Sequence, residues 1–94
     1  MPMPEVHFTI RWPDGLEERC YSPSTAIRQY LEAGETYSLP DFLDRARAGL
    51  NRASERVAAR YGYFCSSAMD QLSRLELRAA SQSQDGQVAC LSLS

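Results

Sequence analysis

Residues 5–21 read EVHFTIRWPDGLEERCY, and this stretch decides the fold. Apolar side chains alternate with polar ones from Val6 to Trp12, which is the period of a strand with one buried face. The loop residues Pro13-Asp14-Gly15 fit a three-residue hairpin turn with glycine in the left-handed position. The sequence therefore predicts an antiparallel hairpin whose second strand returns through Tyr21.

The turn also sets which residues face each other across the hairpin. Because side chains alternate between the two faces of a strand, one pairing fixes all the others. The predicted pairs on the core side are Trp12–Leu16, Ile10–Glu18 and Phe8–Cys20, and those on the polar side are Arg11–Glu17 and His7–Tyr21. His7 is accordingly interpreted as a solvated or tyrosine-contacting residue rather than a catalytic one.

A short helix is predicted after the hairpin, near residues 24–32. Ser22 can cap its start, Pro23 suits the first helical position, and Gly34 follows its end.

Two longer helices are predicted next. Ser38 can cap the first, with Asp41 three residues later, and Gly62 ends it. The second runs from about Ser66 or Ser67 to Ala80. The predicted inward-facing residues are Phe42, Ala46, Leu50, Ala53, Val57 and Tyr61 in the first and Ala68, Met69, Leu72, Leu75 and Ala79 in the second.

Residues 87–93 indicate a last strand, which is expected to join the hairpin. The predicted order is strand, strand, helix, helix, helix, strand. This order predicts an α+β fold, with a three-stranded sheet and about three helices packed on one face. Residues 1–94 are interpreted as a single domain, because no linker or internal repeat interrupts them.

Composition excludes several classes of protein. The 94 residues are 44% hydrophobic, which is enough for one core without metal or disulfide staples. Cys20, Cys65 and Cys90 lack C-x-x-C spacing and His7 is the only histidine, so reduced thiols and no metal or cofactor are expected. A net charge of −2 argues against nucleic-acid binding. No apolar stretch approaches the roughly 20 residues of a membrane span, and we expect a cytoplasmic location.

Cys65 is the one weak candidate for a catalytic residue. It lies at the predicted start of the last helix, where backbone N–H groups and the helix dipole favour a thiolate. The competing interpretation is a buried packing residue, because aromatic side chains precede it. Packing is favoured, since no base accompanies the thiol.

Arginine residues supply the candidate binding surfaces, and all ten basic residues are arginine. Arg45, Arg52, Arg56 and Arg60 share a broad sector of the long helix and could bind a carboxylate, a phosphate or an acidic partner. A solvated helix face is the favoured alternative. The polar sheet face, with Arg11 and Arg19, is a second candidate surface, for another copy or another protein.

The assembled segments resemble a known family. They are Val6–Gly15, Cys20–Ser24, Tyr37–Leu39, Ala53–Val57, Arg60–Gly62 and Cys65–Leu72. This pattern is similar to a small bacterial family labelled as nitrogen starvation response proteins. The resemblance implies a gene cluster with a nitrilase-type hydrolase, a radical SAM protein, an acetyltransferase-like protein and a flavoprotein, associated with nitrogen limitation and nitrile or cyanide use. It implies no catalytic residues.

We therefore expect a non-catalytic accessory protein of such a pathway, which binds a cluster enzyme or itself through the sheet edge and the arginine-bearing helix. The alternative is a thiol-dependent enzyme or carrier of a small electrophile that uses Cys65, with Arg60 stabilising the anion. Binding of a small ligand between sheet and helices is a third class that the sequence leaves open.

Overall fold

The hairpin forms in the register that the sequence predicts. In the computed structural model, which describes residues 5–62 and 66–93, strand β1 (Val6–Arg11) pairs antiparallel with β2 (Glu17–Ser22). The backbone N–H of Trp12 donates to the carbonyl oxygen of Leu16 at 2.8 Å. Gly15 has a φ of 92°, a left-handed conformation that glycine adopts without strain. All four predicted pairs within the strands are confirmed.

The sheet has four strands, so the prediction of three was wrong. Their order is β2-β1-β4-β3, with β4 (Gln87–Leu93) beside β1 as expected. The unexpected strand, β3 (Thr36–Ser38), pairs antiparallel with the start of β4. Three residues are too few to show a period of two, and the partner of β3 lies about fifty residues further along the chain. Local sequence therefore contains no signal for this strand.

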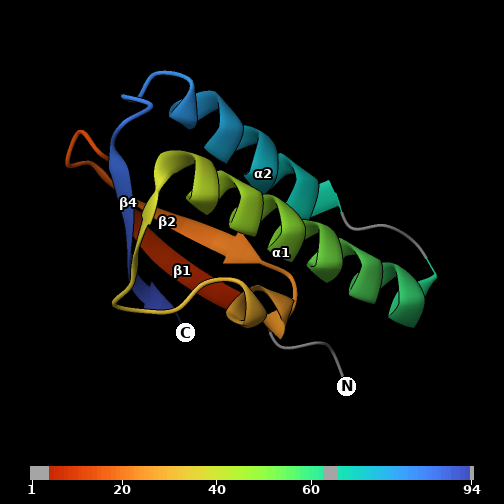
Figure 1. Cartoon of the computed structure of the whole chain (residues 1–94). Coiled ribbons are helices and arrows are strands. Elements are labelled where there is room, and N and C mark those ends of the chain that lie inside the picture. The colour runs from red at the N-terminus through yellow and green to blue at the C-terminus, as the bar shows by residue number, and fades with distance from the viewer. Residues whose placement is uncertain (1–4, 63–65, 94) are drawn as a thin grey trace.

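The two long helices are confirmed. Helix α1 (Leu39–Tyr61) begins after Ser38, whose Oγ accepts a hydrogen bond from the backbone N–H of Asp41 at 3.3 Å, and ends at Gly62, with φ 78°. Helix α2 (Ser66–Ala79) covers the second predicted range. Figure 1 shows the two helices side by side across one face of the sheet, with the end of α1 extending beyond the strands.

The predicted short helix was wrong as an α-helix. Residues Thr25–Gln29 form instead a 3-10 helix, η1, capped by Ser24. Its buried residues, Ala26 and Ile27, are adjacent and do not form a helical stripe. A segment this short gains too few backbone hydrogen bonds to stabilise an α-helix, so its packing against the rest of the fold decides its shape.

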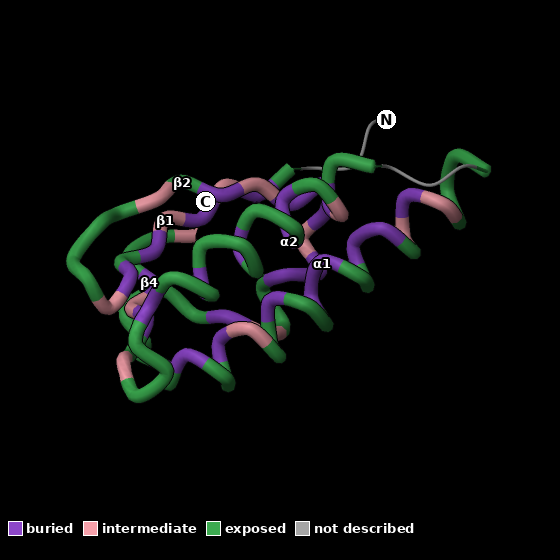
Figure 2. The backbone as a smooth tube through the Cα atoms, turned by 90° about the horizontal axis from the view of Figure 1, so that it is seen from above, coloured by how far each residue is buried: buried purple, intermediate pink, exposed green. Residues whose placement is uncertain are grey.

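The core lies between the sheet and the helices, and Figure 2 shows buried positions alternating with exposed ones along both helices. Trp12 is 1% exposed and meets Phe42 of α1 edge to face, with ring centroids 5.8 Å apart. η1 packs closely on α1 at Gly49, where a Cβ atom would lie 2.5 Å from Cδ1 of Ile27. Among the predicted inward residues of α1, Tyr61 is exposed, because it lies at the end that extends past the sheet.

Helix α2 lies against the edge strand β2. The side chain of Gln71 is buried, and its Oε1 accepts a hydrogen bond from the backbone N–H of Tyr21 at 3.0 Å. This bond occupies an edge N–H that would otherwise be open to another strand. Within residues 5–62 and 66–93, neither helix is apolar enough over its length to cross a membrane.

Candidate functional site

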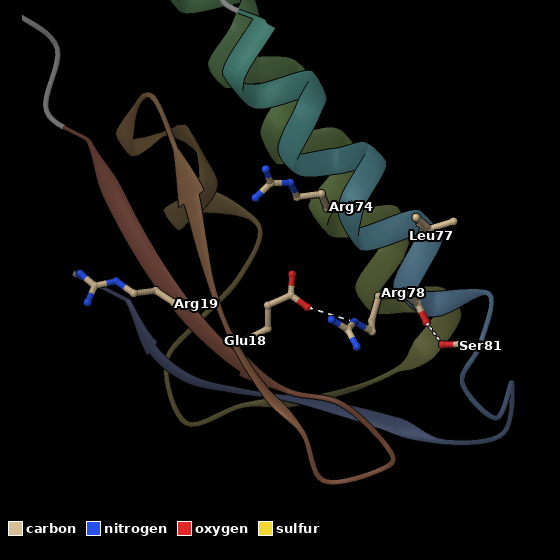
Figure 3. Close-up of a pocket in the computed structure, with 6 residues that line it drawn as sticks. All are labelled: Glu18, Arg19, Arg74, Leu77, Arg78 and Ser81. Carbon is tan, nitrogen blue, oxygen red and sulfur yellow. Dashed lines mark hydrogen bonds and ion pairs between the residues drawn. The ribbon is translucent and has the colours of Figure 1, made fainter.

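An open cleft of about 530 Å³ lies between strand β2 and helix α2. We call it the β2–α2 cleft. It is lined by Glu18 and Arg19 of β2, Arg74, Leu77 and Arg78 of α2, and Ser81 just after α2 (Figure 3).

Helical and strand periodicity explain how these side chains are aimed. Arg74 and Arg78 are four residues apart, so they lie on the same face of α2, and Figure 3 shows both on the side toward β2. Glu18 is on the core face of β2, opposite Ile10, and its carboxylate points toward α2. Arg19 follows Glu18 and points away from it, because successive strand residues alternate between faces.

Glu18 is held in place from the core side of the cleft. Trp12 Nε1 donates a hydrogen bond to Glu18 Oε1 at 3.0 Å, and Arg78 Nε lies 3.5 Å from the same oxygen. The Glu18 side chain is only 22% exposed. Glu18 therefore satisfies a buried indole N–H and partly neutralises Arg78.

Arg74 and Arg19 have no counter-ion among the described residues. In the part of the chain that the structure describes, neither side chain has a hydrogen bond or an ion pair. By contrast, Arg11, Arg45, Arg47 and Arg52 each contact a carboxylate at 3.0–3.2 Å. The guanidinium groups of Arg74 and Arg78 face the cleft, and Glu18 is the one carboxylate among its lining residues, so the cleft is locally positive in a chain of net charge −2.

Leu77 adds an apolar group to the rim of the cleft. Its exposed fraction is 78%, the largest of the exposed large hydrophobic residues in the described ranges. Figure 3 shows it projecting from α2 away from Glu18. Ser81 closes the end of the cleft, where its Oγ donates to the carbonyl oxygen of Arg78 at 2.8 Å.

The four arginines predicted on the long helix each contact a different group. Arg45 Nε lies 3.1 Å from both carboxylate oxygens of Asp41, and its Nη1 donates to the carbonyl oxygen of Tyr30 at 3.1 Å. Arg52 pairs with Glu55 at 3.2 Å.

The other two lie toward the end of α1. Arg56 Nη1 donates to Thr25 Oγ1 at 3.5 Å, and the guanidinium of Arg60 lies 5.9 Å from the ring centroid of Tyr61. The contacts of all four arginines thus run along most of α1, from Asp41 to Tyr61, rather than converging on one point. A common anion-binding cradle on α1 remains a prediction.

The polar face of the hairpin is arranged as predicted. Arg11 and Glu17 form an ion pair at 3.0 Å, and the rings of His7 and Tyr21 lie 5.7 Å apart. Both sheet edges are limited as pairing sites, because Gln71 binds the backbone of β2 and β3 has only three residues.

The described cysteines are poor nucleophiles. Cys20 and Cys90 are both buried, and burial raises the pKa of each thiol. For Cys20 the negative charge of Glu18 adds to this effect on the pKa. Cys65, the predicted candidate, lies outside the described residues. In the described ranges no three His, Cys, Asp or Glu side chains gather as metal ligands.

Sequence reasoning identified Arg19 of this cleft but missed Glu18, Arg74, Leu77 and Arg78 as site residues. Two signals were present. The hairpin register places the acidic Glu18 on the core face, where a charge needs a partner. Leu77 is an apolar residue outside the inward stripe of its helix.

Comparison with known proteins identifies a family. Residues 7–93 match the family described as nitrogen starvation-induced protein NitG, so the match extends from β1 to β4. No curated protein and no solved structure gives a significant match.

Proposed function

Because the chain belongs to the NitG family of nitrogen starvation-induced proteins, we propose that it is a non-catalytic accessory protein that binds a partner protein in the nitrogen starvation response. The proposed binding surface consists of the β2–α2 cleft and the exposed Leu77 at its rim. This surface replaces the sheet edge and the arginines of α1 as the leading candidate.

The observation that carries the proposal is that Arg74 and Arg78 face the cleft from α2, with the exposed Leu77 of the same helix at its rim. Leu77, which is 78% exposed, adds an apolar contact at the rim of this charged cleft, as protein interfaces combine apolar and polar groups. Arginine is enriched at such interfaces, and it contributes strongly where it has no competing partner in the free protein. Arg74 meets that condition among the described residues.

The charge of the cleft selects the kind of partner. A locally positive site in an otherwise acidic chain is complementary to a partner segment that carries carboxylates and an apolar side chain for Leu77. The resemblance implies a gene cluster, and the enzymes of that cluster are the natural candidates for this partner. Self-association is the competing outcome.

The test compares the same substitutions, arginine or leucine to serine, made inside and outside the cleft. Tagged wild-type, Arg74→Ser and Leu77→Ser proteins are crosslinked in cells grown under nitrogen limitation. The protein that the wild type captures is then purified, and its dissociation constant is measured for the wild type and for each variant. The matched controls are Arg28→Ser, an exposed arginine without a hydrogen bond or ion pair to any described residue, and Leu16→Ser, an exposed leucine of the hairpin loop.

We expect each cleft variant to raise the dissociation constant about tenfold or more, as hot-spot truncations do, and each control to leave it within about twofold. Equal effects of cleft and control variants contradict the proposal. A wild-type protein that binds only its own copies, seen as a dimer in analytical ultracentrifugation, contradicts it as well.

Thiol-dependent chemistry at Cys65 is the second candidate function. The observation in its favour is that both described thiols are buried, which leaves Cys65 as the cysteine for such chemistry. The rate of alkylation of Cys65 against pH tests it. A rate at neutral pH no faster than that of a free thiol removes this candidate.

A further inference from the structure

Glu18 is a carboxylate within the β2–α2 cleft that already contacts Arg78, and this ion pair indicates the chemistry of the ligand that the cleft would bind. Building on the proposed function, we infer that Arg74 and Arg78 together bind a carboxylate of the partner's acidic side chain, and that Glu18 weakens this binding by competing for Arg78.

Arg74 provides the first part of the carboxylate site. Its side chain extends from α2 toward β2 (Figure 3) and has no ion pair or hydrogen bond with any described residue. A guanidinium group presents a planar fork of N–H donors that matches the two oxygens of a carboxylate. Arg78 lies one turn further along the same face of α2, so a single carboxylate can approach both.

Arg78 is only partly occupied by Glu18. The contact joins its Nε to Glu18 Oε1 at 3.5 Å, which is longer than a strong charge-assisted hydrogen bond. The Nη groups of Arg78 make no hydrogen bond with a described residue. This leaves donors for a second carboxylate, as in Arg47, which binds Asp44 at 3.1 Å and Glu76 at 3.2 Å.

Glu18 cannot readily leave the cleft when a ligand arrives. Its Oε1 accepts the indole N–H of Trp12, a residue that is 1% exposed, and releasing it would leave that buried donor unpaired. The negative charge of Glu18 therefore stays beside the bound carboxylate and repels it. Replacing Glu18 by glutamine removes the charge but keeps an oxygen that accepts from Trp12.

The experiment measures anion binding directly, with succinate as the probe. The Nε–H signals of the arginines are followed by NMR in uniformly ¹⁵N-labelled protein while succinate is added at constant ionic strength, with sodium chloride as the reference titration. We expect the signals of Arg74 and Arg78 to shift and that of Arg28 to stay.

Glu18→Gln is compared with Glu17→Gln, which removes the same charge one residue away, on the opposite face of the sheet. Removing a like charge about one side chain away from the bound carboxylate is expected to lower the dissociation constant for succinate about fivefold. Glu17→Gln is expected to leave it nearly unchanged. Succinate that shifts Arg28 as strongly as Arg74, or equal constants for the two variants, overturns the inference.

The same variants, titrated with the captured partner, separate the two proposals. A partner that binds Glu18→Gln and Glu17→Gln equally overturns the role of Glu18 but leaves the proposed function standing. If succinate binds at Arg74 and Arg78 but the crosslinking experiment captures no partner protein, the proposed function is overturned, and with it the partner as the source of the carboxylate. The ligand is then a free carboxylic acid.

Discussion

Asp14 and Gln82 are joined by two reciprocal hydrogen bonds. The backbone N–H of Asp14 donates to Gln82 Oε1 at 3.2 Å, and Gln82 Nε2 donates to Asp14 Oδ2 at 3.1 Å. The pair links the loop between β1 and β2 to the segment that follows α2, across 68 positions of sequence. It therefore ties together the two elements that form the walls of the β2–α2 cleft, at the end where Ser81 closes it.

The hydrogen bonds that Asp14 accepts make stability depend on pH. Hydrogen bonds from the backbone N–H of Leu16 and then from Gln82 lower the pKa of Asp14 below its ordinary value of 3.8. A lowered folded-state pKa stabilises the protein above the unfolded-state value, and the contribution disappears as the pH falls through the folded-state value.

We expect wild-type protein to be more stable than Asp14→Asn at pH 7 and the difference to shrink below about pH 4. Urea unfolding at steps between pH 7 and pH 2 measures it. A stability difference that stays constant over this range would show that the Asp14 charge contributes nothing.

Glu18 is predicted to matter for folding as well as for binding. Glu18→Leu leaves Trp12 Nε1, which donates at 3.0 Å in the wild type, without an acceptor in a buried site. An unsatisfied buried donor costs about 1–3 kcal/mol, so the free energy of unfolding should fall by that amount. Glu18→Gln should stay within about 1 kcal/mol of the wild type, because the amide oxygen still accepts. Equal losses in both variants would argue against the hydrogen bond as the cause.

Gly49 should be required by packing rather than by backbone conformation. Alanine in a helix is favoured over glycine by about 1 kcal/mol, but here its Cβ would lie 2.5 Å from Cδ1 of the fully buried Ile27. Overpacking of a core costs about 1–3 kcal/mol, so we expect Gly49→Ala to be destabilising on balance.

Ile27→Val tests this explanation, because it removes the methyl group that the new Cβ would meet. In that background Gly49→Ala should cost clearly less. The contact with Tyr30, whose Cδ2 would lie 3.2 Å from the added Cβ, keeps part of the cost. A double-mutant cycle in urea measures the coupling. Additive effects of the two substitutions would show that the contact with Ile27 is not the reason for glycine at position 49.

Cys20 and Cys90 should resist alkylation in the folded protein. Burial raises the pKa of both thiols, so little thiolate forms at neutral pH and the reagent has no access. In a Cys65→Ser variant we expect labelling by iodoacetamide at pH 7 to be slow and to accelerate in urea at the unfolding midpoint. Rapid labelling without denaturant would show that the core around β2 and β4 opens.

Local sequence patterns predicted the elements whose own residues show a clear periodicity, turn or cap. The alternation from Val6 to Trp12 with a glycine turn gave the hairpin and its register, because a period of two allows one pairing. Capping residues and apolar stripes placed α1 and α2 to within a residue or two. The resemblance to a nitrogen starvation family was likewise present in the sequence, and the family match over residues 7–93 confirms it.

Tertiary structure decided the rest. β3 exists because β4 offers it a partner, and η1 adopts its shape where it packs on Gly49, so neither depends on its own periodicity. The β2–α2 cleft arises because the chain brings Glu18 beside Arg78, sixty residues apart, and leaves Arg74 without a counter-ion in the described chain. Sequence periodicity reports which face of an element is apolar. Which charged side chains meet across two elements depends on how those elements pack, and that is a property of the folded chain as a whole.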